Sequence, residues 1–273
     1  MDSEGMVVES YPTNKSLGQH WLHDTATLSA IVAAANLHTT STVLEIGPGL
    51  GTLTNALLAT QATVIAVEYD TRLALQLEKS INNGSLTVVN HDILTYNLTE
   101  LPKEYTVVAN IPYYITSKLI RLLCESANPP KRAVLLVQKE VAQRIAAKPG
   151  GMSILSISAQ VYSSVSLGTI VPAALFTPPP KVDSQVVILE RRTQPMVPDA
   201  ILTQFFQVVK AGFSERRKKL RSSLSGGLRI EKAHADILLA TANISPNARA
   251  QELSIADWIH LTQIFSKDPT STL

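Results

Sequence analysis

The pattern of apolar and polar positions divides the chain into two parts. Between residues 42 and 190, short apolar runs alternate with amphipathic stretches, which indicates strands and helices in turn. After residue 198 the runs of β-branched residues stop and the periodicity is helical throughout. The pattern therefore predicts an α/β fold with helices on both faces of the sheet, followed by a small all-α domain.

The expected elements follow from these runs. Strands are predicted at residues 42–46, 63–68, 86–90, 105–109, 133–138, 161–171 and 182–190. Helices are predicted at residues 24–37 (with Asp24 as N-cap), 52–59, 115–126, 139–147, 153–160, 199–213, 215–224, 232–241 and 255–265. Two prolines interrupt the periodicity between residues 191 and 198. We therefore expect a catalytic domain at residues 1–192 and a helical domain at residues 193–273.

Composition narrows the class of protein. With 45% hydrophobic residues the chain can bury a core, and the single cysteine, Cys124, excludes an intramolecular disulfide and a cysteine-rich metal site. The acidic start is unlike a signal peptide, and no apolar run reaches the roughly 20 residues that span a bilayer. We expect a soluble, cytoplasmic monomer with no metal and no membrane partner.

Polar and glycine positions follow three successive predicted strands. Strand 42–46 leads into Gly47-Pro-Gly49-Leu-Gly51, strand 63–68 ends in Glu68, and Asp92 follows strand 86–90. The carboxyl ends of parallel strands share one edge of the sheet, where ligands bind. Glycines allow close backbone approach to a ligand, and an acid about twenty residues further on suits ribose hydroxyls. Taken alone, the glycine run is equally consistent with a tight turn that binds no ligand. Each acid, taken alone, is equally consistent with an ordinary surface charge.

The glycine spacing bears on the cofactor. A dinucleotide is usually bound by GxGxxG, whereas this chain has the tighter Gly47-x-Gly49-x-Gly51. S-adenosylmethionine has no pyrophosphate; it needs a turn for its methionine part, an acid for its ribose and a partner for its adenine. Gly47, Glu68 and Asp92 supply that set.

The stretch Asn110-Ile111-Pro112-Tyr113 follows the fourth strand. It distinguishes between the two candidate cofactors, a dinucleotide and S-adenosylmethionine. The Asn110 side-chain carbonyl and the Ile111 main-chain carbonyl, held by the proline, can accept hydrogen bonds from an exocyclic amino group, and Tyr113 can stack on the base. A tetrahedral nitrogen would then direct its lone pair at the sulfonium methyl, so orientation supplies most of the rate. A dehydrogenase has no use for this stretch. The alternative is a strand that ends in an ordinary turn.

Two further stretches have both a structural and a functional interpretation. Phe176-Thr-Pro-Pro-Pro-Lys181 is a stiff connector, or it holds Phe176 over the pocket as a second stacking face. The run at residues 216–221 is a solvated helix face or a phosphate-binding patch. Its basic residues are Arg216, Arg217, Lys218, Lys219 and Arg221. Residues 193–273 carry ten Lys and Arg against seven Asp and Glu, so the modest basic excess lies here.

Together these stretches resemble the ribosomal RNA small-subunit adenine dimethyltransferases (KsgA/RsmA type). The matching stretches, in chain order, are KSLGQHWL, VLEIGPGLGTLT, VIAVEYD, HDIL, NIPYYITSKLI, FTPPPKVDS and FSERRKKLRSSL. The resemblance implies a Rossmann-like class I methyltransferase that dimethylates N6 of two adjacent adenines in a 3′-terminal hairpin of 16S rRNA during small-subunit assembly. It implies a cofactor site at His20, Leu22, Gly47, Gly49, Glu68, Asp92 and Asn110, and a catalytic motif at Asn110–Tyr113 with Phe176 nearby.

The chain departs from the family pattern in three places. His20-Trp21 stands where Asn-Phe is common, Tyr114 where a second Asn is usual, and Gly150-Gly151-Met152 where a Tyr-Gly pair is usual. None removes a catalytic atom, so we expect them to bear on cofactor affinity.

Other functions on the same scaffold remain open. One alternative is an assembly or transcription factor that binds RNA with weak or no catalysis. Another is a large-subunit rRNA adenine methyltransferase of the erythromycin-resistance type, and a nicotinamide oxidoreductase is more distant.

Overall fold

The computed structural model of the chain describes residues 19–215 and 217–268. Within them, a seven-stranded sheet has the order β4-β3-β2-β5-β6-β9-β7, with the last two strands antiparallel to their neighbours. Its strands are β2 (Thr42–Ile46), β3 (Thr63–Glu68), β4 (Leu86–Asn90), β5 (Thr106–Asn110), β6 (Arg132–Gln138), β7 (Ser163–Val171) and β9 (Ser184–Arg191). A second, two-stranded sheet pairs β1 (Trp21–Leu22) with β8 (Phe176–Thr177). Strand order reverses at β2, so the carboxyl ends of β2 and β5 form the switch point at which ligands bind.

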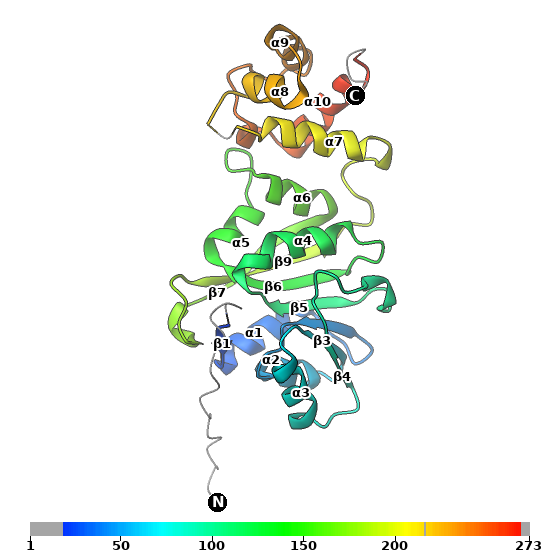
Figure 1. Cartoon of the computed structure of the whole chain (residues 1–273), viewed down its shortest axis with the longest axis vertical. Coiled ribbons are helices and arrows are strands. Elements are labelled where there is room, and N and C mark those ends of the chain that lie inside the picture. The colour runs from blue at the N-terminus through cyan, green and yellow to red at the C-terminus, as the bar shows by residue number, and fades with distance from the viewer. Residues whose placement is uncertain (1–18, 216, 269–273) are drawn as a thin grey trace, which may run out of the picture.

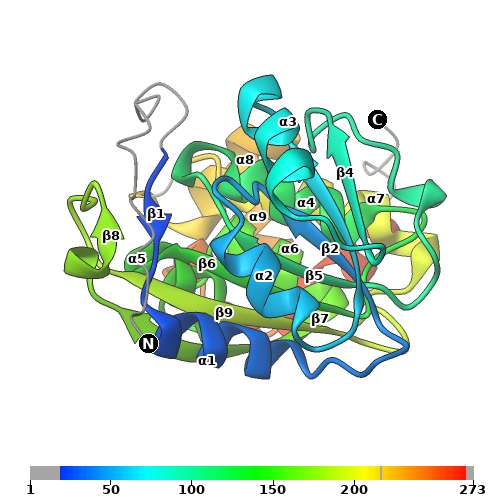
Figure 2. The ribbon, with the colours of Figure 1, turned by 90° about the horizontal axis from the view of Figure 1, so that it is seen from below.

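Helices cover both faces of the large sheet (Figure 1). On one side lie α1 (Thr25–Ala35) and α2 (Thr52–Leu58), and α3 (Thr71–Ser80) packs on β3 and β4. On the other side lie α4 (Thr116–Glu125), α5 (Lys139–Ile145) and α6 (Ile154–Tyr162). Figure 2 shows α1 crossing the sheet beneath β9, and β1 beside β8.

Alternation along the buried strands explains this layering. Val43 and Val108 pack with α1 and α2, whereas their neighbours Leu44 and Val107 pack with α4. Successive side chains of a strand point to opposite faces of the sheet. Strands that are apolar on both faces are therefore covered by helices on both faces.

The C-terminal helices form a further layer beyond α6 (Figure 1). They are α7 (Asp199–Gly212), α8 (Leu220–Leu228), α9 (Lys232–Thr241) and α10 (Ile255–Ser266). The apolar cluster of α4–α6 continues into this layer through buried Phe205 and Trp258. The backbone N–H groups of Gly150 and Met152 donate to the Gln251 carbonyl at 2.9 and 3.1 Å, which joins the α5–α6 connection to the helical layer.

The predicted fold class is confirmed, but the start of one helix is corrected, and helix α3 and the small sheet of β1 and β8 are elements for which there was no prediction. Helix α3 was not predicted; the Asp70 side chain accepts a hydrogen bond from Arg72 N and caps it. The predicted helix 215–224 is wrong at its start, because α8 begins at Leu220 and most of the basic run lies in the preceding turn.

Among the described residues, no helix is both long and apolar enough to cross a membrane.

Candidate active site

The glycine turn after β2 has a backbone that only glycine adopts readily. Gly47, Gly49 and Gly51 have φ values of 68°, 56° and 81°. A Cβ at Gly49 would also collide with the indole of Trp21, which lies directly on the turn. Gly51 is the N-cap of α2, so the turn presents that helix's N-terminus to the pocket.

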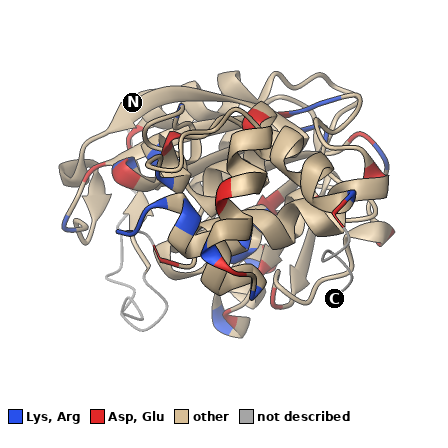
Figure 3. Cartoon of the chain, turned by 90° about the horizontal axis from the view of Figure 1, so that it is seen from above, with Lys and Arg blue, Asp and Glu red and all other residues tan. Residues whose placement is uncertain are grey.

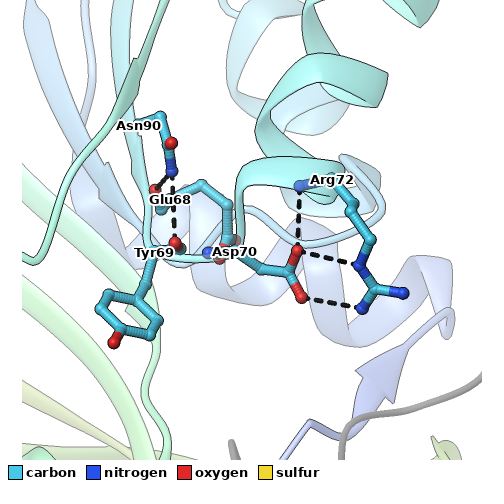
Figure 4. Close-up of polar contacts among 5 residues, drawn as sticks. All are labelled: Glu68, Tyr69, Asp70, Arg72 and Asn90. Carbon is cyan, nitrogen blue, oxygen red and sulfur yellow. Dashed lines mark hydrogen bonds and ion pairs between the residues drawn. The ribbon is translucent and has the colours of Figure 1, made fainter.

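Glu68 is the last residue of β3, and its carboxylate supports the backbone of the glycine turn. Its Oε2 accepts a hydrogen bond from Gly49 N at 3.1 Å and its Oε1 accepts one from Asp70 N at 2.9 Å. Figure 4 shows the segment around it, where the Asn90 amide donates to the carbonyls of Glu68 and Tyr69 at 2.9 and 3.2 Å. Burial raises the pKa of Glu68, while the two backbone donors oppose that rise. The carboxylate is thus fixed in position with lone pairs left for ligand hydroxyls.

Asp92 lies after β4, at the same edge. Its Oδ1 accepts a hydrogen bond from Leu94 N at 2.9 Å, which fixes the carboxylate while its second oxygen can accept from a ligand. Tyr69 and Tyr114, 62% and 61% exposed, belong to the same pocket lining, so its rim is aromatic.

Asn110 is the last residue of β5 and is tied to the segment before β1. Its Nδ2 donates to the carbonyl of His20 at 3.2 Å. Because the amide nitrogen is engaged there, Oδ1 is the atom left to accept a hydrogen bond from a substrate. Thr52 Oγ1 donates to the Leu22 carbonyl at 2.9 Å and holds β1, the strand that follows, to α2.

Tyr113 opens a short 3₁₀ turn, Tyr113–Ile115, after the strand. Its hydroxyl is 3.1 Å from the hydroxyl of buried Ser184, and its ring stacks on that of His20 with centroids 6.0 Å apart. Burial raises the pKa of Tyr113, so the phenol stays neutral at neutral pH.

These groups line one pocket of about 400 Å³, a size suited to a small cofactor. Ten residues predicted for the site line it: His20, Leu22, Gly47, Gly49, Glu68, Asp92, Asn110, Ile111, Pro112 and Tyr113. Their placement together is a finding, whereas their individual roles in binding and catalysis stay predictions.

The structure does not bring Phe176 to this pocket. Its side chain is 3% exposed and packs in the cluster of Leu22, Val171 and the residues of α1. The register of the small sheet explains this, because Leu22 and Phe176 are directly paired. A second stacking face at Phe176 would need a movement of β8.

The described part of the basic run, residues 217–221, lies on the helical layer, away from the residues that line the pocket. Lys218 pairs with Glu215, Arg221 pairs with Asp236 at 2.9 Å, and Lys219 Nζ donates to Asn247 Oδ1 at 2.6 Å. Arg217 is exposed, and no ion pair is found for it within the described residues, while Arg216 lies outside them.

Sequence reasoning missed Glu45 in β2. It lines the pocket and is 1% exposed. Burial raises its pKa to about 8, a hydrogen bond from the Thr54 side chain opposes this rise, and the charge of Glu68 adds a smaller increase. A carboxylate in the middle of an otherwise apolar strand was the signal in the sequence.

Glu45 makes stability depend on pH in the absence of a ligand. The pKa of Glu45 is about 8 in the folded protein, against an ordinary value of 4.5. Between pH 4.5 and 8 the folded state therefore holds a proton that the unfolded state has lost. The free energy of unfolding should therefore fall as pH rises from about 5 to 8, by on the order of 3 kcal/mol. Urea unfolding across this range should show a flatter profile for Glu45→Gln. Glu78→Gln, an exposed change on α3, should keep the wild-type slope; equal slopes for all three proteins would contradict the assignment.

No group of three or more His, Cys, Asp and Glu residues suited to a metal ion occurs in the part of the chain that the structure describes.

Solved structures share this fold. A dimethyladenosine transferase from Plasmodium falciparum superposes with a TM-score of 0.79 at 28% identity, over 91% of this chain and 98% of that one. The 23S rRNA methyltransferase ErmE superposes with a TM-score of 0.74 at 28% identity, over 90% of this chain and all of that one (100%). The sheet order, the glycine turn and the acids at the strand ends define a Rossmann-like class I methyltransferase.

The profile of the ribosomal RNA adenine dimethylase family matches residues 11–267, and the chain belongs to this family. It is 39% identical over 269 residues to the ribosomal RNA small subunit methyltransferase A of Dehalococcoides mccartyi, covering 96% of this chain and 92% of that protein. The protein of the same name from Bacillus cereus is 39% identical over 271 residues, covering 94% of this chain and 93% of that one.

Proposed function

We propose that this protein uses S-adenosylmethionine to dimethylate the N6 amino groups of two adjacent adenines in a 3′-terminal hairpin of 16S rRNA during small-subunit assembly. The observation that carries this proposal is the orientation of Asn110. Its amide nitrogen is held by the His20 carbonyl, so its oxygen is available, at the edge of the pocket that holds Glu68 and Asp92.

The residues present fit S-adenosylmethionine. The glycine turn provides the close backbone approach, Glu68 would accept from the ribose hydroxyls, and Asp92 would accept from the adenine amino group. The buried carboxyl of Glu45, which lines the pocket, suits the cofactor's ammonium group, because a buried carboxyl gains most from a cationic partner. When bound, the cofactor supplies an electrophilic methyl carbon.

Asn110 and Tyr113 would place the target nitrogen. The Asn110 oxygen and the Ile111 carbonyl would accept the two N6 hydrogens, and this favours a tetrahedral nitrogen whose lone pair faces the methyl group. Tyr113 would stack on the adenine and compensate for its removal from the RNA stack. The methylated nitrogen loses its proton readily, so no strong base is required of the chain.

Small-subunit RNA is favoured over large-subunit RNA by the comparisons. The relatives at 39% identity carry the small-subunit name, whereas identity to the 23S enzyme ErmE is 28%. We further propose a monomer that acts in the cytoplasm, which size-exclusion chromatography with light scattering and cell fractionation would test.

The function is tested by methyl transfer from labelled cofactor to undermethylated small subunits, with large subunits and naked 16S rRNA in parallel. Label should enter small-subunit RNA as N6,N6-dimethyladenosine at two adjacent positions. Label in large subunits alone would indicate a large-subunit rRNA adenine methyltransferase of the erythromycin-resistance type. Binding to small subunits with no transfer would indicate a non-catalytic assembly factor.

The basic run is proposed as a phosphate contact remote from the pocket. Figure 3, viewed from the helical layer, shows most Lys and Arg segments in the lower left half, with acidic segments among them. Because Lys218 is already paired with Glu215 and exposed pairs contribute little, Lys218 can exchange that partner for a phosphate, while Arg217 needs no exchange.

Replacing Arg216, Arg217 and Lys218 together by alanine should weaken RNA binding and flatten its salt dependence. Each lost phosphate contact should reduce the slope of log K against log salt by about 1. Filter binding between low and moderate salt measures this slope. Lys79→Ala/Lys103→Ala, exposed lysines outside the pocket and the run, should leave it unchanged. An unchanged slope in the triple variant would make the run a solvated surface.

A further inference from the structure

We propose that His20 is a positioning residue on the substrate side of the pocket, where its imidazole ties the proline-rich loop to Tyr113 and fixes the surface on which the target base stacks. This inference rests on the proposed function, and it departs from the expectation that His20 contacts the cofactor. His20 is also one of the positions at which the chain differs from the family pattern.

The first contact is with the proline-rich loop. His20 Nδ1 lies 2.7 Å from the carbonyl oxygen of Pro178. A carbonyl can only accept, so Nδ1 must carry the proton. The pairing of β1 with β8 explains the contact: Trp21 faces Thr177, and His20 and Pro178 occupy the next position along the same register.

The second contact is with the ring of Tyr113. The two rings are stacked, with centroids 6.0 Å apart and planes inclined by 24°. At its other end the Tyr113 hydroxyl is 3.1 Å from Ser184 Oγ at the start of β9. The Tyr113 ring is therefore held at its face by His20 and at its tip by Ser184.

The third contact is made by the main chain of the same residue. The His20 carbonyl accepts the hydrogen bond from Asn110 Nδ2 at 3.2 Å, which leaves the Asn110 oxygen for the substrate. One residue thus contacts both members of the proposed catalytic pair and the loop opposite them. A change of the His20 side chain leaves the carbonyl in place, so the imidazole can be tested apart from the Asn110 contact.

The contacts of the imidazole are with the loop and with Tyr113. Its Nδ1 is engaged by Pro178 and its ring stacks on Tyr113, while the carboxylates of Glu68 and Asp92 line the same pocket and can hold the cofactor. Loss of the ring should therefore disturb base placement more than cofactor affinity. Misplacement of reacting groups by about 1 Å can cost roughly 10²-fold in rate.

The test compares His20→Ala, His20→Asn and His20→Phe with the wild type. Asn keeps a side-chain N–H donor for the Pro178 carbonyl, and Phe keeps only the ring. Single-turnover methyl transfer to small subunits is measured at saturating cofactor, together with the Kd for S-adenosylhomocysteine and the thermal midpoint. His38→Ala, an exposed histidine before β2, serves as the matched control.

We expect His20→Ala to lower the single-turnover rate about 10²-fold while the Kd changes by less than about 3-fold. Asn and Phe should each recover part of the rate, because each restores one of the two contacts. An unchanged rate would overturn the proposal, and so would a loss of cofactor affinity that accounts for the whole loss of rate.

A measurement on the protein alone separates this inference from the proposed function. Long-range ¹H–¹⁵N spectra of labelled histidine should show His20, assigned by its loss in His20→Ala, with the proton on Nδ1. An Nε2-protonated His20 would overturn the inference whatever the activity. A correct tautomer in a wild type that methylates no small subunits would instead contradict the proposed function.

Discussion

Replacing Asn110 by alanine is expected to lower the rate constant of methyl transfer by roughly 10³-fold, the scale of losing one precisely placed polar group in an active site. The Asn110 oxygen is the side-chain acceptor at the end of β5, and its amide is held by the His20 carbonyl. The variant loses the acceptor that orients the amino group. Single-turnover transfer to undermethylated small subunits measures the change.

Cofactor affinity should hardly change in the same variant, staying within a few-fold of the wild type. Asn55→Ala, an exposed asparagine on α2 that does not line the pocket, should leave both quantities at their wild-type values. If Asn110→Ala lost its folded structure instead, the residue would be a structural turn. If it kept most of its rate, the orientation argument would be wrong.

Replacing Glu68 by alanine is expected to raise the Kd for S-adenosylmethionine by about 10²-fold. Two charge-assisted hydrogen bonds to ribose hydroxyls would be lost, at about 1.5 kcal/mol or more each. The change also removes the acceptor of the Gly49 N–H group, which helps to fix the glycine turn. Isothermal titration calorimetry measures the affinity.

Glu78→Ala removes an exposed carboxylate from α3 and should bind the cofactor as the wild type does. A thermal melt of Glu68→Ala keeps loss of affinity distinct from loss of fold. If a folded Glu68→Ala bound the cofactor with unchanged affinity, Glu68 would only support the backbone of the turn.

The sheet and its ligand-binding edge could be predicted because their signals are local. Apolar runs gave the strands, and the residue after each run lies at the carboxyl edge of a parallel sheet wherever neighbouring strands pair. Glu68, Asp92 and Asn110 were therefore predicted at one edge, and they line one pocket. The division of the chain after residue 192 stays a prediction.

The misses depend on contacts between distant segments. Phe176 faces the α1 cluster because it pairs with Leu22, and no local pattern reveals that pairing. Helix α8 begins at Leu220, whose N–H donates to the Ala248 carbonyl at 2.8 Å from a remote loop. Helix α3, in contrast, had a readable signal in Asp70 and the apolar positions Leu73 and Leu77.

The most direct test of the central claim is a crystal structure of the protein with S-adenosylhomocysteine and an RNA hairpin bearing the target adenines. The account predicts the ribose hydroxyls at Glu68, the cofactor adenine at Asp92, and a flipped target adenine on Tyr113 with its amino group at the Asn110 oxygen and its nitrogen facing the sulfur. An RNA adenine bound elsewhere, or an Asn110 amide turned away from both ligands, would contradict it.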